Sequence, residues 1–247
     1  MSSAMDSCEA IPERTVRIDT LEQWPGGVVH LVVKAEDDPE LGSTIPFEAG
    51  RYAELTPPGG VARYFSFASA ANKDGTAEFY IKLHENGYFS DYLRAATVGD
   101  ELSLRGPEGS FGLRENGVRP RWMVCGGTGL APCMSMLRQM AERGETQEAL
   151  LIVGVNTPQE IFATDAMADL CARLPTLRTV VTVAQPDERW TGPVGTSVDV
   201  LDAELTARGG SQAPDIYLCG PPGFLQAAGD CAARHGVPES QIYQERA

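Results

Sequence analysis

Residues 122–132 read WMVCGGTGLAP, a short apolar run followed by a glycine-rich turn and a proline that opens a helical pattern. Glycines let a ligand approach the backbone closely, and the free N–H groups at a helix start attract phosphate. These residues are therefore suited to holding a nucleotide. The pattern is not a strict G-x-G-x-x-G, so taken alone it also fits a strand–turn–helix without a ligand.

A second candidate for phosphate chemistry is the sequence Arg63-Tyr64-Phe65-Ser66, which follows a turn rich in proline and glycine. Alternate residues of a strand share a face, so Arg63 and Phe65 should point one way and Tyr64 and Ser66 the other. A guanidinium presents a planar fork of donors that fits a diphosphate. The alternative is a pair of barrel core residues beside a surface arginine.

Two further motifs carry polar groups next to glycine. Gly87 and Ser90 precede a helical pattern, where glycine lets the backbone close on a phosphate and Ser90 can cap the helix or donate to an oxygen. Cys219 follows an apolar run and precedes Gly-Pro-Pro, at the carboxyl end of a predicted parallel strand, where ligands gather. The alternative for Ser90 is a simple N-cap, and the other cysteines are interpreted as core thiols.

The first half of the chain, which must position the arginine motif, has the pattern of a small antiparallel barrel. Short alternating runs separated by Gly/Pro turns are typical of such a fold. They predict one helix starting near Ser90 and strands at residues 15–21, 28–34, 52–56, 62–67, 78–83 and 101–105.

After residue 117, strands alternate with helices, which predicts βαβ units and a parallel sheet. The strands are expected at residues 121–124, 149–155, 177–183, 215–218 and 242–243, and the helices at 132–143, 159–174, 197–208 and 222–235. We therefore predict two domains, a Greek-key β-barrel at 11–115 and a Rossmann-like α/β domain at 118–247. Residues 1–10 are interpreted as a tag or leader.

Composition narrows the function classes. The net charge of −14 argues against nucleic acid and anionic membranes as partners. No apolar run reaches the length of a membrane span, and no secretory signal is visible. The six cysteines form no C-x-x-C pair and no plant-type iron–sulfur spacing, and the three histidines are scattered. We expect reduced thiols, no metal and a cytoplasmic protein.

Taken together and in this order, the motifs resemble the ferredoxin–NADP reductase superfamily, which carries R-x-Y-S in a flavin-binding barrel and then G-G-T-G-x-A-P and C-G-P-P in a pyridine-nucleotide domain. The resemblance covers nearly the whole chain from about Arg14. Residues 85–93 (ENGYFSDYL), 106–113 (GPEGSFGL) and 215–223 (DIYLCGPPG) look like the reductase components of bacterial oxygenases, in particular soluble methane monooxygenase reductases. Those proteins usually carry an N-terminal ferredoxin domain, so we expect this chain to be the FAD/NADH half of such a reductase.

The resemblance implies roles for single residues. Arg63 would pair with the flavin diphosphate, Phe65 would stand where the family has Tyr against the isoalloxazine, and Ser66 would reach the flavin N5. A second diphosphate clamp at Gly87 and Ser90 favours FAD over FMN. The expected FAD-binding residues are Arg63, Tyr64, Phe65, Ser66, Lys82, Gly87, Phe89 and Ser90.

The same resemblance places the nicotinamide beside Cys219, in a role of shape and polarity rather than covalent chemistry. The expected catalytic residues are Ser66, Cys219 and Glu245. The expected NADH-binding residues are Gly127, Thr128, Gly129, Ala131, Pro132, Asn156, Cys219, Gly220, Pro221, Pro222 and Phe224.

Two segments of the sequence bear on how the nucleotide binds, the C-terminus and the residues after the second parallel strand. Relatives end in an acidic, a basic and an aromatic residue that covers the flavin, whereas this chain keeps Glu245 and Arg246 and ends in Ala247. We expect the nicotinamide to reach the flavin without first displacing a ring. After the second parallel strand the chain has Asn156 and Glu160 and no basic residue before Arg173, so we expect a preference for NADH over NADPH.

These features predict hydride transfer from NADH to FAD, then single-electron release to a 2Fe-2S ferredoxin domain that feeds a di-iron methane or hydrocarbon monooxygenase hydroxylase. We expect a monomer. Two alternatives stay open, a reductase of another aromatic or alkene oxygenase and a non-catalytic flavin relay subunit.

Overall fold

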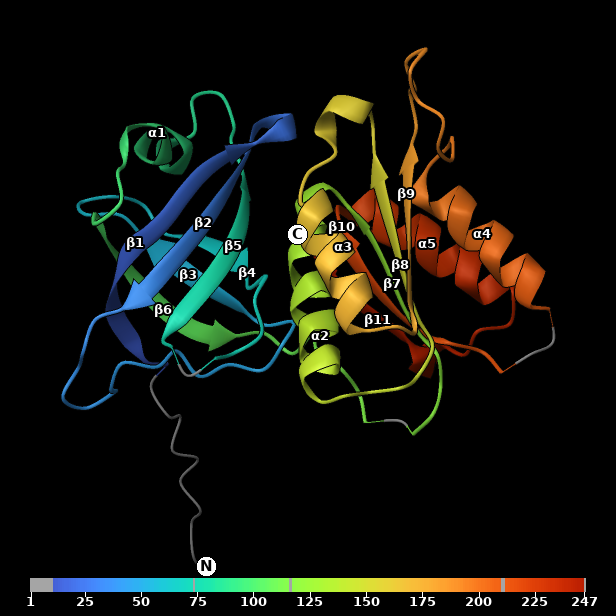
Figure 1. The fold of residues 1–247 in the computed structure, drawn as a ribbon, viewed down its shortest axis with the longest axis horizontal. Helices are drawn as coiled ribbons and strands as arrows, with labels where there is room; N and C mark the ends of the chain where they lie inside the picture. The colour runs from blue at the N-terminus through green and yellow to red at the C-terminus, as the bar shows by residue number, and fades with distance from the viewer. Residues whose placement is uncertain (1–10, 73, 116, 210–211, 247) are drawn as a thin grey trace, which may run out of the picture.

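The computed structural model describes residues 11–72, 74–115, 117–209 and 212–246, with the backbone alone at residue 246. Figure 1 shows two bodies side by side, a curled sheet from the N-terminal half and an α/β layer from the C-terminal half. The proposed leader at residues 1–10 and the terminal Ala247 lie outside the described residues.

The N-terminal body is an antiparallel sheet of six strands in the order β4-β3-β6-β1-β2-β5. Strand β6 lies between β3 and β1, so spatial order departs from chain order, as in a Greek key. Phe67 pairs with Phe79 and brings the two edge strands together, which confirms the predicted barrel. The strands are β1 (Glu13–Trp24), β2 (Val28–Ala35), β3 (Tyr52–Thr56), β4 (Arg63–Ser66), β5 (Thr76–Lys82) and β6 (Glu101–Glu108).

Alternation along these strands fills the barrel. Val16 and Ile18 on β1 and Leu31 and Val33 on β2 are almost completely buried. Burying each such side chain stabilises the fold by about 1.5–3 kcal/mol. Helix α1 (Tyr88–Ala95) follows β5 and adds Phe89 and Leu93 to the same core.

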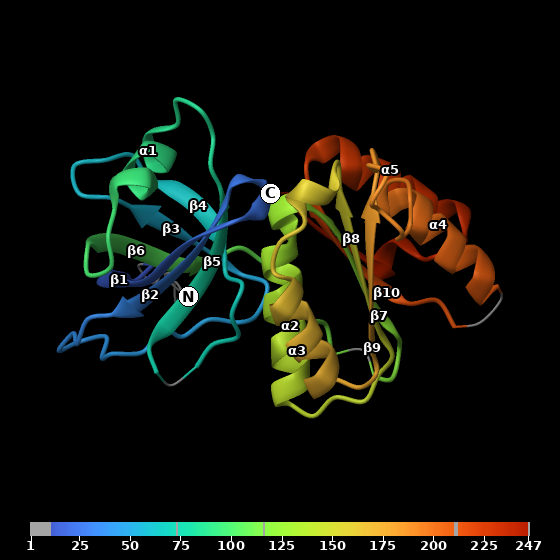
Figure 2. The same cartoon turned by 45° about the horizontal axis from the view of Figure 1, so that its top comes forward.

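The C-terminal body is a parallel sheet in the order β11-β10-β7-β8-β9. Its strands are β7 (Arg121–Gly126), β8 (Ala149–Val155), β9 (Leu177–Val183), β10 (Asp215–Gly220) and β11 (Ile242–Arg246), and its helices are α2 (Leu130–Glu142), α3 (Thr164–Arg173), α4 (Ser197–Arg208) and α5 (Pro222–Arg234). Figure 2 shows α2 and α3 between the barrel and the sheet, and α4 and α5 on the far face. This arrangement confirms the predicted α/β layer.

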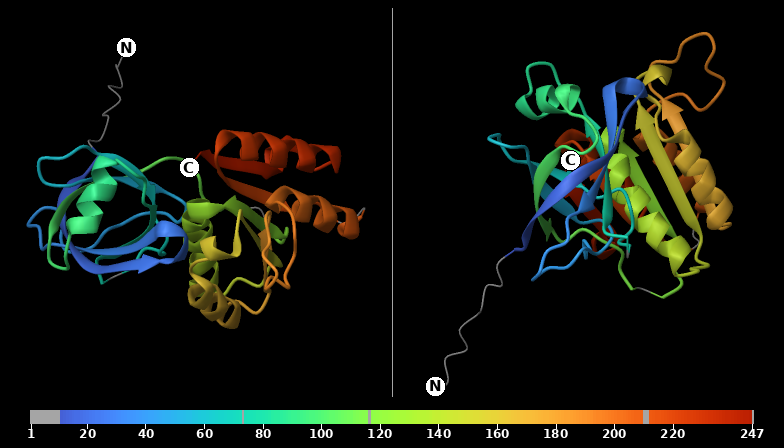
Figure 3. Two further views of the ribbon diagram at one scale, coloured as in Figure 1. Left: turned by 90° about the horizontal axis from the view of Figure 1, so that it is seen from above. Right: turned by 60° about the vertical axis from the view of Figure 1, so that its left-hand side comes forward.

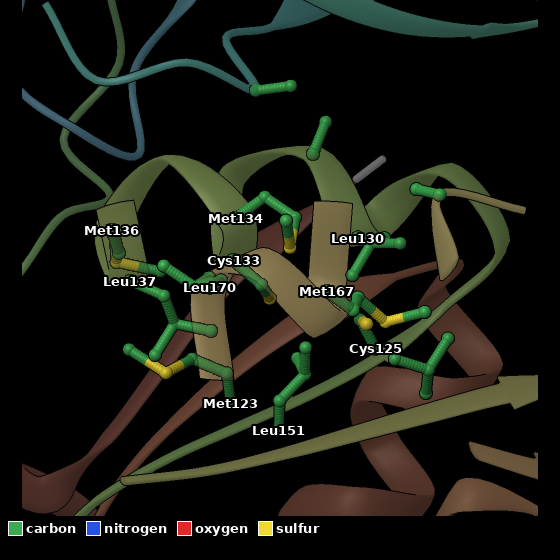
Figure 4. Packing of buried hydrophobic residues seen from close by; sticks show 14 of the residues in the cluster. Met123, Cys125, Leu130, Cys133, Met134, Met136, Leu137, Leu151, Met167 and Leu170 are labelled. Atoms are coloured by element: carbon green, nitrogen blue, oxygen red, sulfur yellow. The ribbon is translucent and has the colours of Figure 1, made fainter. Parts of the chain in front are cut away.

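Helix α2 is covered on both sides, by the sheet and by the barrel. Its buried residues include Leu130, Cys133, Met134 and Leu137, which meet Met123 of β7 (Figure 4). A helix that is apolar around most of its circumference is stable only when buried in this way. The unbranched methionines fill the irregular space between the layers.

The helix predicted at residues 159–174 is shorter in the structure. Pro158–Glu160 forms a single 3-10 turn (η3), Ala163 takes a left-handed backbone (φ 56°), and α3 begins only at Thr164. The interruption turns the Phe162 ring toward the barrel, where its centroid lies 5.7 Å from that of Tyr80. Packing between the two bodies therefore outweighs local helix propensity here.

The two bodies are joined through β5 and α2 (Figure 3). The Arg138 guanidinium of α2 pairs with the Glu78 carboxylate of β5 and also donates to the Ala68 carbonyl at 2.9 Å. His30 Nε2 lies 2.9 Å from Glu78 Oε1. Burial raises the pKa of Glu78, but hydrogen bonding from His30 and the charge of Arg138 outweigh it and lower this pKa to about 2.

Among the described residues, the helices are all too short or too polar to cross a membrane.

The Glu78 carboxylate should make stability depend on pH. Because folding lowers its pKa from 4.5 to about 2, its contribution of about 3 kcal/mol is complete above pH 4.5 and lost as the pH falls toward 2. Glu78→Gln should destabilise the protein at pH 7, and its difference from wild type should shrink over that window. Chemical denaturation at pH 7 and pH 3 measures this.

The matched control is Glu36→Gln, which removes an exposed ion pair with Arg17 and should cost less than about 1 kcal/mol. A stability difference for Glu78→Gln that stays constant down to pH 2 would contradict this assignment.

Candidate active site

A cavity of about 340 Å³ lies along β4, β5 and the start of α1. We call it the barrel cavity. Its size is within the range of small-molecule sites. It is lined by Arg63, Tyr64, Phe65, Tyr80, Ile81, Lys82, His84, Gly87, Tyr88, Phe89, Ser90 and Thr128.

Strand β4 presents both of its faces to this cavity. Glu54 of β3 lies opposite Tyr64, and the buried Ala53 lies opposite Phe65. The Phe65 ring lies 4.9 Å from the Phe89 ring and packs on the barrel core. Because β4 is the last strand in the sheet order, Tyr64 and Phe65 both reach the cavity rim.

The cations at the barrel cavity are available for a ligand. Arg63 is exposed and donates to the Ala62 carbonyl at 2.8 Å, and no carboxylate among the described residues pairs with it. Lys82 donates to the Gly26 carbonyl at the tip of the β1–β2 hairpin. Two cations facing an open cavity fit an anionic ligand such as a diphosphate.

The N-cap of α1 differs from the expected Ser90. Gly87 occupies the N-cap position, whereas Ser90 lies inside the helix and is buried. The Ser90 hydroxyl accepts the His84 N–H at 3.0 Å. This bond ties the Ser90 side chain to the segment that follows β5, and Ser90 forms part of the cavity wall.

A second cavity of about 500 Å³ lies at the carboxyl ends of β7 and β8. Proteins with open α/β sheets bind their ligands at this end of the strands. We call this second cavity the sheet cavity. It is lined by Gly26, Val28, Lys82, His84, Gly126, Gly127, Thr128, Gly154, Val155, Asn156, Glu160, Phe162, Ala184, Thr196, Ser197, Pro221 and Phe224.

The glycine loop is packed against the end of β10. A Cβ at Gly129 would lie 2.4 Å from the Cys219 carbonyl oxygen, so the chain requires glycine there. Gly127 takes a left-handed backbone (φ 53°) that turns the loop into α2. Pro132 is the third residue of α2 rather than its first, a position where a missing N–H still breaks no helix bond.

The other end of the sheet cavity is acidic. The Asn156 N–H donates to Glu160 Oε2 at 2.9 Å, which holds this carboxylate at the cavity wall. The hairpin tip packs on the same segment, because a Cβ at Gly26 would lie 2.9 Å from the Glu160 Cα. Lys82 and His84, the basic residues of this lining, lie with Thr128 at the boundary with the barrel cavity.

Lys82, His84 and Thr128 line both cavities and thus form a shared wall. Sequence reasoning identified Lys82 and Thr128 but missed His84. The sequence could have indicated His84, because it follows Lys82 by two residues and alternate residues of an extended chain share one side. Gly26 was also missed, and nothing local in the sequence indicates that the hairpin tip reaches the other body.

The three expected catalytic residues, Ser66, Cys219 and Glu245, line neither cavity. Cys219 is fully buried beside Gly129, and burial raises its pKa well above the usual value. Glu245 pairs with Cys219 across β10 and β11, and burial raises its pKa as well. Ser66 is half-buried opposite Tyr52. The expected residues that line neither cavity are Ser66, Gly129, Ala131, Pro132, Cys219, Gly220, Pro222 and Glu245.

Comparison with known protein families finds two domains along the chain. Residues 27–112 match the oxidoreductase FAD-binding domain, and residues 123–230 match the oxidoreductase NAD-binding domain. Over 99% of this chain and 73% of the other, the fold superposes on the cytochrome P450 reductase GcoB of Amycolatopsis with a TM-score of 0.85 at 24% identity. The ferredoxin reductase of a carbazole 1,9a-dioxygenase gives 0.84 at 27% identity, over 96% and 69% of the two chains.

Similar sequences are reductase components. The propane 2-monooxygenase reductase of Rhodococcus jostii is 36% identical over 81% of this chain and 55% of its own length. The methane monooxygenase component C of Methylosinus trichosporium is 38% identical over 72% and 53%. The propane 2-monooxygenase reductase of Mycolicibacterium smegmatis is 33% identical over 95% and 68%. The chain spans a little over half the length of the first two relatives.

The chain therefore belongs to the family of FAD- and NAD-binding reductase components of oxygenase systems, and it is an oxidoreductase.

The contact between the glycine loop and β10 can be tested with two glycines of the same loop. Gly129→Ala should cost about 1–3 kcal/mol, because its Cβ meets backbone atoms of Cys219 that cannot move freely. Gly126→Ala should cost less than about 1 kcal/mol, because its Cβ would make an ordinary 3.7 Å contact with the Gly154 oxygen. Denaturant unfolding of both variants measures the difference, and equal losses would refute this packing.

Proposed function

We propose that the chain oxidises NADH and releases electrons singly to a 2Fe-2S ferredoxin domain that serves an oxygenase hydroxylase. The observation that carries this proposal is the wall of Lys82, His84 and Thr128 shared by the two cavities. A dinucleotide in each cavity would bring two ring systems together at that wall. Bound FAD supplies the conversion of a two-electron donor into single-electron release.

The residues of the barrel cavity fit FAD. Arg63 offers an unpaired guanidinium for the diphosphate, and Phe65 supplies an aromatic face without the hydroxyl that a Tyr would add. Gly87 has no side chain, so a phosphate can approach the backbone at the start of α1 closely. The Ser90 hydroxyl can donate its proton to the cofactor while it accepts the His84 N–H. These contacts hold and orient the cofactor, which is the protein's share of the chemistry.

The residues of the sheet cavity favour NADH. Gly127 lets a diphosphate approach the backbone of the glycine loop closely, and Thr128 of the same loop stands at the boundary between the cavities. Glu160, held by the Asn156 N–H, can accept from a ribose hydroxyl. The same carboxylate would repel the extra phosphate of NADPH, since no basic residue among those described lines that end of the cavity.

Cys219 and Glu245 act on the reacting region from behind the glycine loop. The raised pKa of Cys219 keeps it a neutral thiol at neutral pH, so it supplies shape and weak polarity. The raised pKa of Glu245 places its proton exchange nearer to neutrality than that of an ordinary glutamate. Ser66 follows Phe65 on β4, at the position expected to reach the flavin N5.

The partners follow from the relatives. Their names include reductases of propane and methane monooxygenases, which supports a di-iron hydrocarbon monooxygenase as the partner. We also propose that the protein is a cytoplasmic monomer with domains at 11–115 and 118–247. A phenol 2-monooxygenase reductase and a toluate 1,2-dioxygenase electron transfer component are also similar, so an aromatic oxygenase is the second candidate. The hydroxylase that the reduced protein supports distinguishes the two.

Anaerobic rapid mixing of the FAD-loaded protein with each nucleotide tests the proposal. NADH should bleach the flavin at concentrations about tenfold or more below those needed for NADPH, corresponding to roughly 1.4 kcal/mol of discrimination. Glu160→Gln should narrow this ratio, whereas Asp165→Asn, exposed on α3 outside the cavity lining, should not. A yellow protein that neither nucleotide bleaches would favour a relay subunit.

Cys219 gives a separate prediction. Because its pKa is raised, the rate of flavin reduction should show no thiol ionisation between pH 7 and about 9. Cys219→Ala should change the rate less than about tenfold and leave the shape of the pH profile unaltered. The measurement is stopped-flow flavin reduction across this range. An inflection in wild type that disappears in Cys219→Ala would show that a thiolate takes part.

A further inference from the structure

Helices α4 and α5 lie side by side on the face of the sheet away from the barrel (Figures 1 and 2). At their contact, Asp202 of α4 meets Cys231 of α5 and His235, the residue that caps the end of α5. The thiol and the imidazole both contact the Asp202 carboxylate. This cluster belongs to neither cavity of the active site.

The spacing of these three groups is that of metal ligands. His235 Nε2 lies 3.0 Å from Asp202 Oδ1, and Cys231 Sγ lies 3.5 Å from the same oxygen. All three ligand atoms lie within 4.8 Å of one another. In a tetrahedral zinc site, normal bond lengths put nitrogen and oxygen about 3.3 Å apart and sulfur and oxygen about 3.5 Å apart. The separations of His235 and of Cys231 from Asp202 are therefore close to those between zinc ligands.

The surroundings of the cluster suit a cation that stays partly open to water. Cys231 is fully buried, whereas the Asp202 side chain is half exposed, which leaves one side of the site open to solvent. Asp199 adds negative charge near Cys231. Arg234 lies 3.8 Å from Asp202 but is itself largely exposed, so its flexible side chain can move away when a cation enters.

We propose that Asp202, Cys231 and His235 bind Zn²⁺ with a water molecule as the fourth ligand. A site with one thiolate, one imidazole and one carboxylate selects Zn²⁺ over Mg²⁺ or Ca²⁺, which prefer oxygen ligands alone. Binding replaces the Asp202 contacts with three metal bonds: the Cys231 thiol proton is released to solvent, and the His235 Nε2 proton that Asp202 accepts moves to Nδ1 or to solvent. The ion links α4 to α5 behind the nucleotide-binding sheet.

The site was not expected from the sequence, where no metal was predicted. Cys231 and His235 are close in the chain, but Asp202 comes from another helix 29 positions earlier. The packing of α4 on α5 brings the third ligand into place.

Equilibrium dialysis of the FAD-loaded protein against buffered micromolar Zn²⁺, followed by elemental analysis, tests the site. Wild type should retain one zinc per chain. Cys231→Ser and His235→Ala should each weaken binding about tenfold or more. The matched control is Cys171→Ser, a half-buried cysteine on α3 that contacts Thr179, and it should bind zinc like wild type.

A second readout identifies the ligand directly and uses wild type alone. Replacing zinc by Co²⁺ should produce a thiolate-to-cobalt charge-transfer band in the difference spectrum against metal-free holoprotein. Flavin content and reduction by NADH verify that each variant is folded, since none of the three residues lines the nucleotide cavities. Wild type without stoichiometric zinc, cobalt binding without the thiolate band, or undiminished binding in folded Cys231→Ser would overturn the proposal.

Discussion

The contact of α2 with the barrel is the constraint on which the rest of this molecule depends. Arg138 reaches across to Glu78, and Ser135 donates to the Ser69 carbonyl at 2.6 Å. These polar groups are partly buried, so each needs its partner from the other body. They fix the glycine loop at the start of α2 relative to the end of β5. Without that fixed relation, the two nucleotide cavities would not share a wall.

Basic residues stand at the two cavities although the protein as a whole is acidic. The chain carries a net charge of −14, yet Arg63, Lys82 and His84 stand at the cavities where diphosphates are expected. A local cation beside low-dielectric walls attracts an anionic ligand more strongly than the distant acidic surface repels it, because salt screens distant charges. Overall acidity and nucleotide binding are therefore compatible. The acidic Glu160 acts at short range and affects the choice between nucleotides.

Sequence reasoning was most accurate where one local rule decides. The helix at Ser197–Arg208 begins at a capping box of Thr196 and Asp199 and was predicted to the residue. It was least accurate where distant residues compete with local preference. The predicted helix at 159–174 is interrupted because Phe162 packs on Tyr80, and Ser90 lies inside α1 because Gly87 occupies the cap position. The first of these differences depends on a contact between residues far apart in the chain, whereas the second is a local competition between Gly87 and Ser90 for the cap position.

The amino-acid sequence alone determined the two fold classes, the glycine loop and the arginine motif, since hydrophobic period and turn residues are local properties. The cofactors were predicted from the resemblance of these motifs to a known family. The tertiary structure decided which of these residues meet. It brought His84 and Gly26 to the cavities, left Cys219 behind the loop, and joined Asp202 to Cys231 and His235. The physical reason is that packing between helices, strands and the two bodies depends on contacts between residues far apart in the chain, which no local pattern encodes.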